Sequence, residues 1–236
     1  MKKAGILLVL FAFLAVSASA HKAPGISGSE WSRVECDFAG ITWEWDGSFV
    51  TEMCDTEGLP IWQYGLDSSI PQYDCDGNPI GNVLGTVLNG AYPSDAGERA
   101  ILGTPFEVSG ATYLLELCHY YDTENSYDGG NVELLVDGAW VVIDPMGGYP
   151  DDLISDSASY YAWCVNDQPG FTDGPVGFIR DCFDLTQFMG MTVQVAVKFG
   201  SDSSVTYPGW FIHSVVAGGE TTTTQSSEWS TIKSLY

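Results

Sequence analysis

The stretch YDTENSYDGG, from Tyr121 to Gly130, gathers side chains that could bind a metal ion. It supplies the side-chain oxygens of Asp122, Glu124, Asn125 and Asp128, and the two closing glycines permit a sharp bend. Calcium takes six to eight oxygen ligands and accepts irregular loops, so the stretch predicts a structural calcium site. The alternative is an ordinary turn between two strands, in which the same Asp and Asn side chains cap the backbone.

A second group of residues could bind sugar, because aromatic rings stack on the apolar face of a pyranose. The candidate ligand-binding residues are aromatic side chains in or near the predicted loops: Trp43, Trp45, Trp62, Tyr64 and Trp163. The alternative is that these large rings bury the loops against the body of the fold. The sequence leaves both interpretations open for each ring.

The chain lacks the common catalytic motifs. It has no H-E-x-x-H, no G-x-S-x-G and no phosphate-binding glycine loop. Of its histidines, His119 and His213 lie in apolar stretches typical of strands, which favours packing over base catalysis. We therefore expect that the protein is not an enzyme. A carboxylate pair for glycoside hydrolysis assembles only in three dimensions, so a cryptic glycoside hydrolase is the alternative.

Residues 1–20 have the features of a signal peptide: Lys2 and Lys3, an apolar run, and the cleavage site Ala18-Ser19-Ala20 before His21. Cleavage of the signal peptide would remove these two lysines, so the formal net charge of −23 for the full chain becomes −25 for the mature chain. Such an acidic excess repels nucleic acid and anionic membranes. No later stretch approaches eighteen apolar residues, so no membrane span is expected. The protein is predicted to be extracellular or attached to a bacterial cell surface.

The chain has an even number of cysteines, which in an exported protein predicts disulfides. The six residues are Cys36, Cys54, Cys75, Cys118, Cys164 and Cys182. Six cysteines allow 15 pairings, and sequence alone does not choose among them. We expect Cys164 to pair with Cys182, because a bridge between near neighbours would close the loop between them.

The clearest local structure is a hairpin. Asn131–Val136 and Ala139–Ile143 are apolar runs separated by Asp137-Gly138, which suits a two-residue turn with positive φ. Met191–Gly200 alternates apolar and polar residues, and Gly209–Val216 is typical of a further strand. Together with the absence of an amphipathic helix, these patterns predict an all-β fold, an antiparallel β-sandwich.

The domain organisation follows from shifts in composition. Residues 21–33 are a loose polar lead-in, residues 34–218 form the sandwich, and residues 219–236 are a polar linker and tail. Within the sandwich, 54–90 and 146–177 are long loops rich in Gly, Pro and Asp. Long ordered loops on a β scaffold often carry binding function, and the disulfides would tether them.

Several phrases resemble one known module. They are FEVSGATYLLELCHYYDTENSYDGGNVELLVDG, GGYP and FDLTQFMGMTVQVAVKFGSDSSVTYPGWFIHSVV, together with the earlier IWQYG and LGTVLNGAYPSDAGERAILGTPFEVSG. The module is the MAM-like jelly roll found near the C-terminus of immune-inhibitor-A-type secreted bacterial metalloproteases. The match runs from about Val34 to Val216, and no protease domain accompanies it. The resemblance implies a jelly-roll sandwich with a non-catalytic role in adhesion, recognition or stabilisation.

The resemblance also implies a structural ion between acids of the first and last strands, but this sequence departs from that pattern. Ala39 stands where the first acid is expected, and His213 and Ser214 replace the acids of the last strand. The ending SSEWSTIKSLY resembles a short C-terminal tail of exported bacterial proteins, which would be a sorting or attachment signal.

The combined prediction is a secreted or cell-surface, non-catalytic binding module for glycan or extracellular protein ligands, with calcium as a structural cofactor. A self-associating structural protein of a surface layer or filament is the rival to this prediction.

Overall fold

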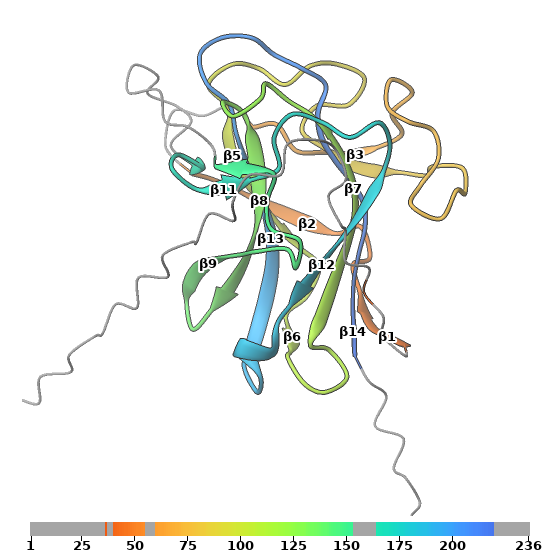
Figure 1. The fold of residues 1–236 in the computed structure, drawn as a ribbon, viewed down its shortest axis with the longest axis vertical. Helices are drawn as coiled ribbons and strands as arrows, with labels where there is room; N and C mark the ends of the chain where they lie inside the picture. Colours follow the sequence, from red (N-terminus) through yellow and green to blue (C-terminus); the bar gives the residue numbers. More distant parts are fainter. Residues whose placement is uncertain (1–35, 37–39, 55–59, 153–163, 220–236) are drawn as a thin grey trace, which may run out of the picture. The chain divides into compact units, whose positions relative to one another are not determined.

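The predicted antiparallel β-sandwich is confirmed (Figure 1). The computed structural model describes residue 36 and residues 40–54, 60–152 and 164–219. The predicted signal peptide, the lead-in and the tail beyond Gly219 lie outside the described residues. No helix among the described residues has the length and apolar character needed to cross a membrane.

Sheet A is antiparallel throughout. Its strands are β1 (Gly40–Glu44), β3 (Gln63–Gly65), β4 (Val83–Gly85), β7 (Leu114–Asp122), β12 (Ile179–Asp184) and β14 (Gly209–Gly219). In space they follow the order β12-β7-β14-β4-β3, and β1 also pairs with β14.

Sheet B is also antiparallel. Its strands are β2 (Phe49–Met53), β5 (Gly97–Leu102), β6 (Phe106–Glu107), β8 (Gly129–Val136), β9 (Ala139–Ile143) and β13 (Thr192–Gly200). They follow the order β2-β5-β13-β8-β9, with β6 pairing to β13. The remaining elements are a ribbon of β10 (Asp151–Asp152) and β11 (Pro169–Gly170), and a 3₁₀ helix, Thr186–Phe188.

Successive segments of the chain alternate between the two sheets. After β5 in sheet B the chain forms β7 in sheet A, the β8–β9 hairpin in sheet B, β12 in sheet A, β13 in sheet B and β14 in sheet A. The order β4-β14-β7-β12 opposite β5-β13-β8-β9 is that of a jelly roll built from two Greek keys. The predicted jelly roll is therefore confirmed.

The alternation of β13 shows why these residues form a sandwich. Val193, Val195 and Val197 are buried in the core, where side chains of both sheets meet. Lys198 lies on the opposite face, yet it is only 3% exposed. Its ammonium forms an ion pair with Glu133 Oε1 at 2.5 Å and donates a hydrogen bond to Gln168 Oε1 at 2.8 Å. These two contacts replace the water that an exposed lysine would bind.

The predicted hairpin turn is present. Asp137 and Gly138 have φ values of 51° and 83°, so both central residues adopt the left-handed region. The turn connects β8 and β9, which pair from Val136↔Ala139 next to the turn to Val132↔Ile143 at the far end. Asn, Asp and Gly tolerate such backbone angles best, which is why the dipeptide predicted the turn.

Three disulfides tether the loops, and none is the predicted one. The pairs are Cys36–Cys182, Cys54–Cys164 and Cys75–Cys118. The predicted Cys164–Cys182 bridge is wrong because the two cysteines are attached to different sheets. Cys182 lies in β12 of sheet A, whereas Cys164 is tied to the end of β2 in sheet B. Disulfides of this number are typical of proteins that fold outside the reducing cytosol.

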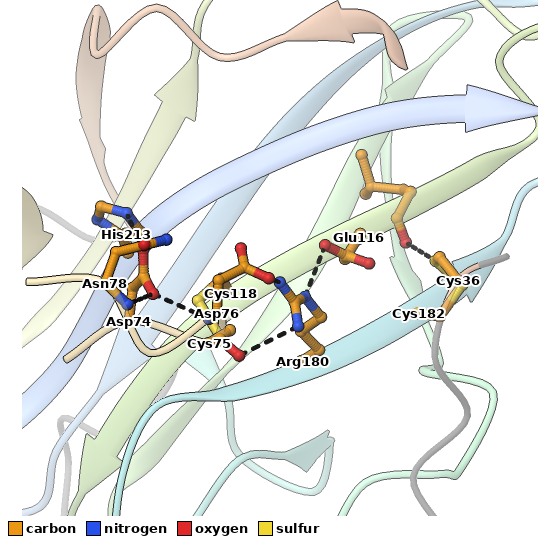
Figure 2. Close-up of polar contacts among 11 residues, drawn as sticks. Cys36, Asp74, Cys75, Asp76, Asn78, Glu116, Cys118, Arg180, Cys182 and His213 are labelled. Atoms are coloured by element: carbon orange, nitrogen blue, oxygen red, sulfur yellow. Dashed lines mark hydrogen bonds and ion pairs between the residues drawn. A yellow bond between two sulfur atoms is a disulfide. The ribbon is translucent and has the colours of Figure 1, made fainter. Parts of the chain in front are cut away.

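The loop between β3 and β4 packs on the outer face of sheet A, and Figure 2 shows its residues Asp74, Cys75 and Asp76 beside Cys118 and Arg180. Its Ile70 packs in a small hydrophobic cluster with Val83 and Phe211. The Cys75–Cys118 disulfide fixes the middle of the loop to β7. Arg180 of β12 adds ion pairs to Asp76 in the loop and Glu116 in β7, together with a hydrogen bond to the Cys75 carbonyl.

Candidate functional site

An open cleft lies where the edge of β14 changes partners. This strand pairs with β4 at Phe211 and Ile212 and with β1 from Val216 to Gly219. His213 and Ser214, which lie between these two pairings, line a cleft of about 500 Å³, which we call the Tyr64 cleft. Its lining residues are Glu44, Trp45, Asp46, Gly47, Tyr64, Asn82, His213 and Ser214.

The turn between β1 and β2 forms one wall of the cleft. The Asp46 carboxylate accepts hydrogen bonds from the amide and the hydroxyl of Ser48. The Trp45 indole donates to the Ser48 carbonyl at 2.5 Å. The hydrogen bonds from the Ser48 side chain and backbone lower the pKa of Asp46, so this carboxyl is ionised at neutral pH. The wall is therefore rigid and negatively charged.

Tyr64 is the exposed aromatic ring of the cleft. Its side chain is 44% exposed, and it meets the buried Trp45 edge-on with ring centroids 5.6 Å apart. Gly47 has a φ of 84°, and a Cβ atom placed there would lie 2.9 Å from the Tyr64 hydroxyl oxygen. Glycine thus permits both the turn and the close approach of the ring.

His213 reaches the opposite wall because β14 carries a bulge there. The register of β14 against β7 shifts between Ile212 and Ser214, and a bulge of this kind re-aims a side chain. His213 Nε2 lies 3.6 Å from Asp74 Oδ2, and Figure 2 shows the two side chains beside each other. Its Nδ1 atom is buried without a hydrogen-bond partner.

The other predicted ligand-binding residues lie elsewhere. Trp43 is half-buried against Phe106, with ring centroids 4.9 Å apart. Trp62 is 7% exposed and packs toward Trp210 in the core. Trp163 lies outside the described residues. Of the predicted aromatic residues, the cleft brings together Trp45 and Tyr64.

A cluster of carboxylates lies at the start of β8. Glu124, Asp128 and Asp202 each offer one oxygen atom, and these atoms lie within 4.8 Å of one another. Asp128 is fully buried; its carboxylate accepts hydrogen bonds from the Tyr92 hydroxyl at 2.7 Å and the Asp202 amide at 2.7 Å. We call these three residues the acidic cluster.

The acidic cluster contains two of the four predicted calcium ligands, Glu124 and Asp128. Asp122 is the last residue of β7, opposite Gly209, and is not in the cluster. Asn125 is exposed, and its side-chain oxygen accepts a hydrogen bond from Ser126.

Sequence reasoning missed the third member, Asp202. It follows β13, whose last residue Gly200 pairs with Gly129 in β8, so the strand register brings it beside Asp128. The sequence did contain a signal for this residue, the polar phrase GSDSS directly after a clear strand. The loop that this phrase would meet could not be identified without the register between β13 and β8.

The electrostatics of the cluster are unfavourable for bare carboxylates. Burial above all, together with the carboxylates of Asp202 and Glu124, raises the pKa of Asp128 to about 7, although hydrogen bonds from Tyr92 and the Asp202 amide lower it. Burial, and then the charge of Asp202, also raise the pKa of Glu124 and of the adjoining Asp95. Glu124 Oε2 and Asp95 Oδ1 are buried without hydrogen-bond partners. A cation would relieve both the repulsion and the unpaired oxygens.

His119, which the sequence predicted to be packed, is fully buried. Its Nδ1 accepts a hydrogen bond from the Trp210 indole at 2.8 Å, and its Nε2 lies 2.8 Å from Asp181 Oδ2. Because Nδ1 is an acceptor, the proton of the neutral ring is on Nε2 and is donated to Asp181. These hydrogen bonds stabilise the packed core, and His119 does not line the Tyr64 cleft.

In the comparisons with known proteins, no protein-family model matches this chain, and no curated protein is significantly similar to it. The resemblance to MAM-like modules therefore stays a prediction carried by the sequence phrases.

Proposed function

We propose that this protein is a secreted or cell-surface, non-catalytic module that binds a glycan in the Tyr64 cleft. The observation that carries the proposal is the exposed ring of Tyr64 beside Trp45, in a cleft that also holds side chains able to hydrogen-bond sugar hydroxyls. An extracellular protein is the alternative ligand, and it would use the same exposed ring as an anchor.

The composition of the cleft favours a sugar. Pyranose rings have an apolar face that packs on an aromatic ring and hydroxyls that exchange hydrogen bonds with planar polar groups. Asn82 offers a planar amide and Ser214 a hydroxyl for such hydrogen bonds. The rigid turn and the Gly47 contact hold Tyr64 before any ligand arrives, which reduces the entropy cost of binding.

The test is a glycan array followed by titration calorimetry with the best ligand. Replacing Tyr64 with alanine should weaken binding at least about tenfold, the effect of removing an anchor residue worth about 1.4 kcal/mol or more. Tyr73→Ala is the matched control, since Tyr73 is 64% exposed but does not line the cleft. An empty array, or equal binding by Tyr64→Ala and wild type, would overturn the proposal.

The same samples test catalysis. Glu44 and Asp46 are two carboxylates in one cleft, which is the observation that favours a glycoside hydrolase. We expect no new reducing ends after prolonged incubation with the bound oligosaccharide. Release of reducing ends that stops in Glu44→Gln would replace the binding function with hydrolysis.

We further propose that the acidic cluster holds a structural calcium ion. Three clustered carboxylates and the unpaired Glu124 Oε2 support this, and the loops that carry them would supply backbone carbonyls. Among the described residues, Arg99, Arg180 and Lys198 all pair with acids outside the cluster, so none of them neutralises it.

The calcium proposal is tested by thermal melts of the purified protein in calcium and in excess EDTA. At 100 times the dissociation constant, calcium adds roughly 2.7 kcal/mol, a rise in melting temperature of about 5–10 °C for a domain of this size. Asp202→Asn should abolish the rise. Asp122→Asn should keep it, because this predicted ligand is not in the cluster. Equal melting temperatures of wild type in both buffers would contradict the proposal.

A further inference from the structure

The charge of the Tyr64 cleft is one-sided. Its lining includes the exposed carboxylates of Glu44 and Asp46, and among the described residues that line it there is no lysine or arginine. His213, a histidine in this lining, already faces the carboxylate of Asp74 at 3.6 Å. A ligand entering the cleft therefore meets the carboxylates of Glu44, at the end of β1, and Asp46, in the turn that follows, together with the imidazole that faces Asp74.

The basic side chains of the described residues are engaged elsewhere. Arg180 pairs with Asp76 and Glu116, and Lys198 pairs with Glu133. Arg99 also pairs with Glu133, at 2.6 Å, and lies over the ring of Trp140. None of these three lines the cleft, so none of them offers a charge partner to a carboxylate or sulfate on a ligand.

We infer, on the basis of the proposed binding function, that the Tyr64 cleft selects glycans bearing protonated amino groups. An ammonium group would be attracted electrostatically by the carboxylates of Glu44 and Asp46, and it would form a cation–π contact with the exposed Tyr64 ring. A neutral sugar keeps the stacking but lacks the charge interaction. A uronate or sulfated sugar meets repulsion from the cleft and from the net charge of −23.

The selectivity should depend on salt, because Glu44 and Asp46 are exposed. Screening lengths fall from roughly 10 Å at 0.1 M salt to about 3 Å at 1 M, which weakens attraction between exposed charges. Preference for an amino sugar should therefore shrink as salt rises, while the stacking contribution to all sugars persists.

The experiment is titration calorimetry with three probes of equal length: the β-1,4-linked tetramers of glucosamine and N-acetylglucosamine, and tetragalacturonate. At about 0.05 M salt and a mildly acidic pH, at which the glucosamine amines carry protons, we expect the glucosamine tetramer to bind roughly 5–10-fold more tightly than its N-acetylated form, and tetragalacturonate to bind most weakly. Raising the salt to about 0.5 M should reduce the preference to about twofold.

Variants locate the effect. Glu44→Gln and Asp46→Asn should each weaken glucosamine binding about 3–5-fold and leave N-acetylglucosamine binding within about twofold. An asparagine at position 46 keeps an oxygen that can accept from Ser48, so the turn should survive. Asp137→Asn is the matched control: it removes one exposed acid at the β8–β9 turn, outside the cleft.

The outcomes separate this inference from the proposed function. If the N-acetylated tetramer binds as tightly as glucosamine and Glu44→Gln changes nothing, the amine selectivity is wrong but glycan binding stands. Tightest binding of tetragalacturonate would also overturn the selectivity. If none of the three probes binds and the glycan array is empty, the proposed function fails and the inference fails with it.

Discussion

Asp74 is a single residue that links the covering loop of sheet A to the Tyr64 cleft. Its Oδ1 atom accepts hydrogen bonds from the amides of Asp76 and Asn78, both at 2.8 Å, while Oδ2 faces His213 (Figure 2). Burial alone would raise the pKa of Asp74, but these amides, the Asn78 side chain and His213 outweigh it and lower the pKa.

We predict that Asp74→Asn destabilises the protein in a pH-dependent way. The pKa of Asp74 is lower in the folded than in the unfolded chain, so ionisation stabilises folding above the usual value of 3.8, and this is lost as pH falls through the folded pKa. Urea unfolding should give a deficit of about 1 kcal/mol at pH 7. At pH 3 the deficit should be clearly smaller. A deficit that is the same at both pH values would contradict the charge argument.

The buried histidine gives a second prediction at this scale. Trp210→Phe removes the indole N–H that His119 Nδ1 accepts, in a site where both side chains are fully buried. We expect a loss of about 2–4 kcal/mol in denaturant unfolding, from the unmade hydrogen bond and the smaller ring. Trp140→Phe is the control, because Trp140 is half-buried at the edge strand β9, and should cost clearly less. Equal losses would mean that ring size alone sets the effect.

Among the elements, β14 has the largest role in building the cleft. It pairs with β7 along one edge and with β4 and β1 along the other, and its bulge turns His213 toward the cleft. The loop between β3 and β4 then closes over the outer face of sheet A, held by Cys75–Cys118. The geometry of the cleft thus depends on how firmly this loop is attached.

Removing the Cys75–Cys118 disulfide, by replacing both residues with serine, should cost about 2–4 kcal/mol of stability. It should also weaken glycan binding, because the freed loop carries Asp74 away from His213. The matched control is the Cys54–Cys164 pair, tied to sheet B away from the cleft. Its removal should lower stability while ligand affinity stays within about twofold of wild type. If both double variants bind as wild type does, the loop does not shape the cleft.

At the scale of the whole molecule, charge is the dominant property. A formal net charge of −23 produces self-repulsion that opposes compaction and also keeps copies of the chain apart. The described basic side chains relieve little of it, because they are few and already paired with acids.

We predict that sodium chloride raises the melting temperature by a few degrees between about 0.02 and 0.5 M, through screening. Calcium chloride at the same ionic strength should give a larger rise in wild type than in Asp202→Asn. Differential scanning calorimetry measures both. An identical response to the two salts in both proteins would show that calcium acts only by screening.

The same repulsion bears on self-association. We expect analytical ultracentrifugation at about 0.15 M salt to find one species across roughly 1–100 µM protein. Growth of the sedimentation coefficient with concentration would instead favour the structural protein of a surface layer or filament.

The sequence by itself determined the local elements. The valine alternation of β13 and the Asp137-Gly138 turn predicted strands and a hairpin that the structure contains, since side-chain period and positive φ are properties of neighbouring residues. The even number of cysteines likewise predicted disulfides, but the pair expected from closeness along the chain, Cys164–Cys182, is wrong. The phrases resembling a known module supplied the jelly roll.

Only the tertiary structure decided which distant residues meet. Asp202 joins Glu124 and Asp128 because β13 and β8 pair in one register, and Tyr64 and His213 line one cleft because β14 changes partners near its bulge. The disulfide pairs follow the sheets, not the distance along the chain. Strand order and register depend on burial summed over the whole core, and no short stretch of sequence contains that sum.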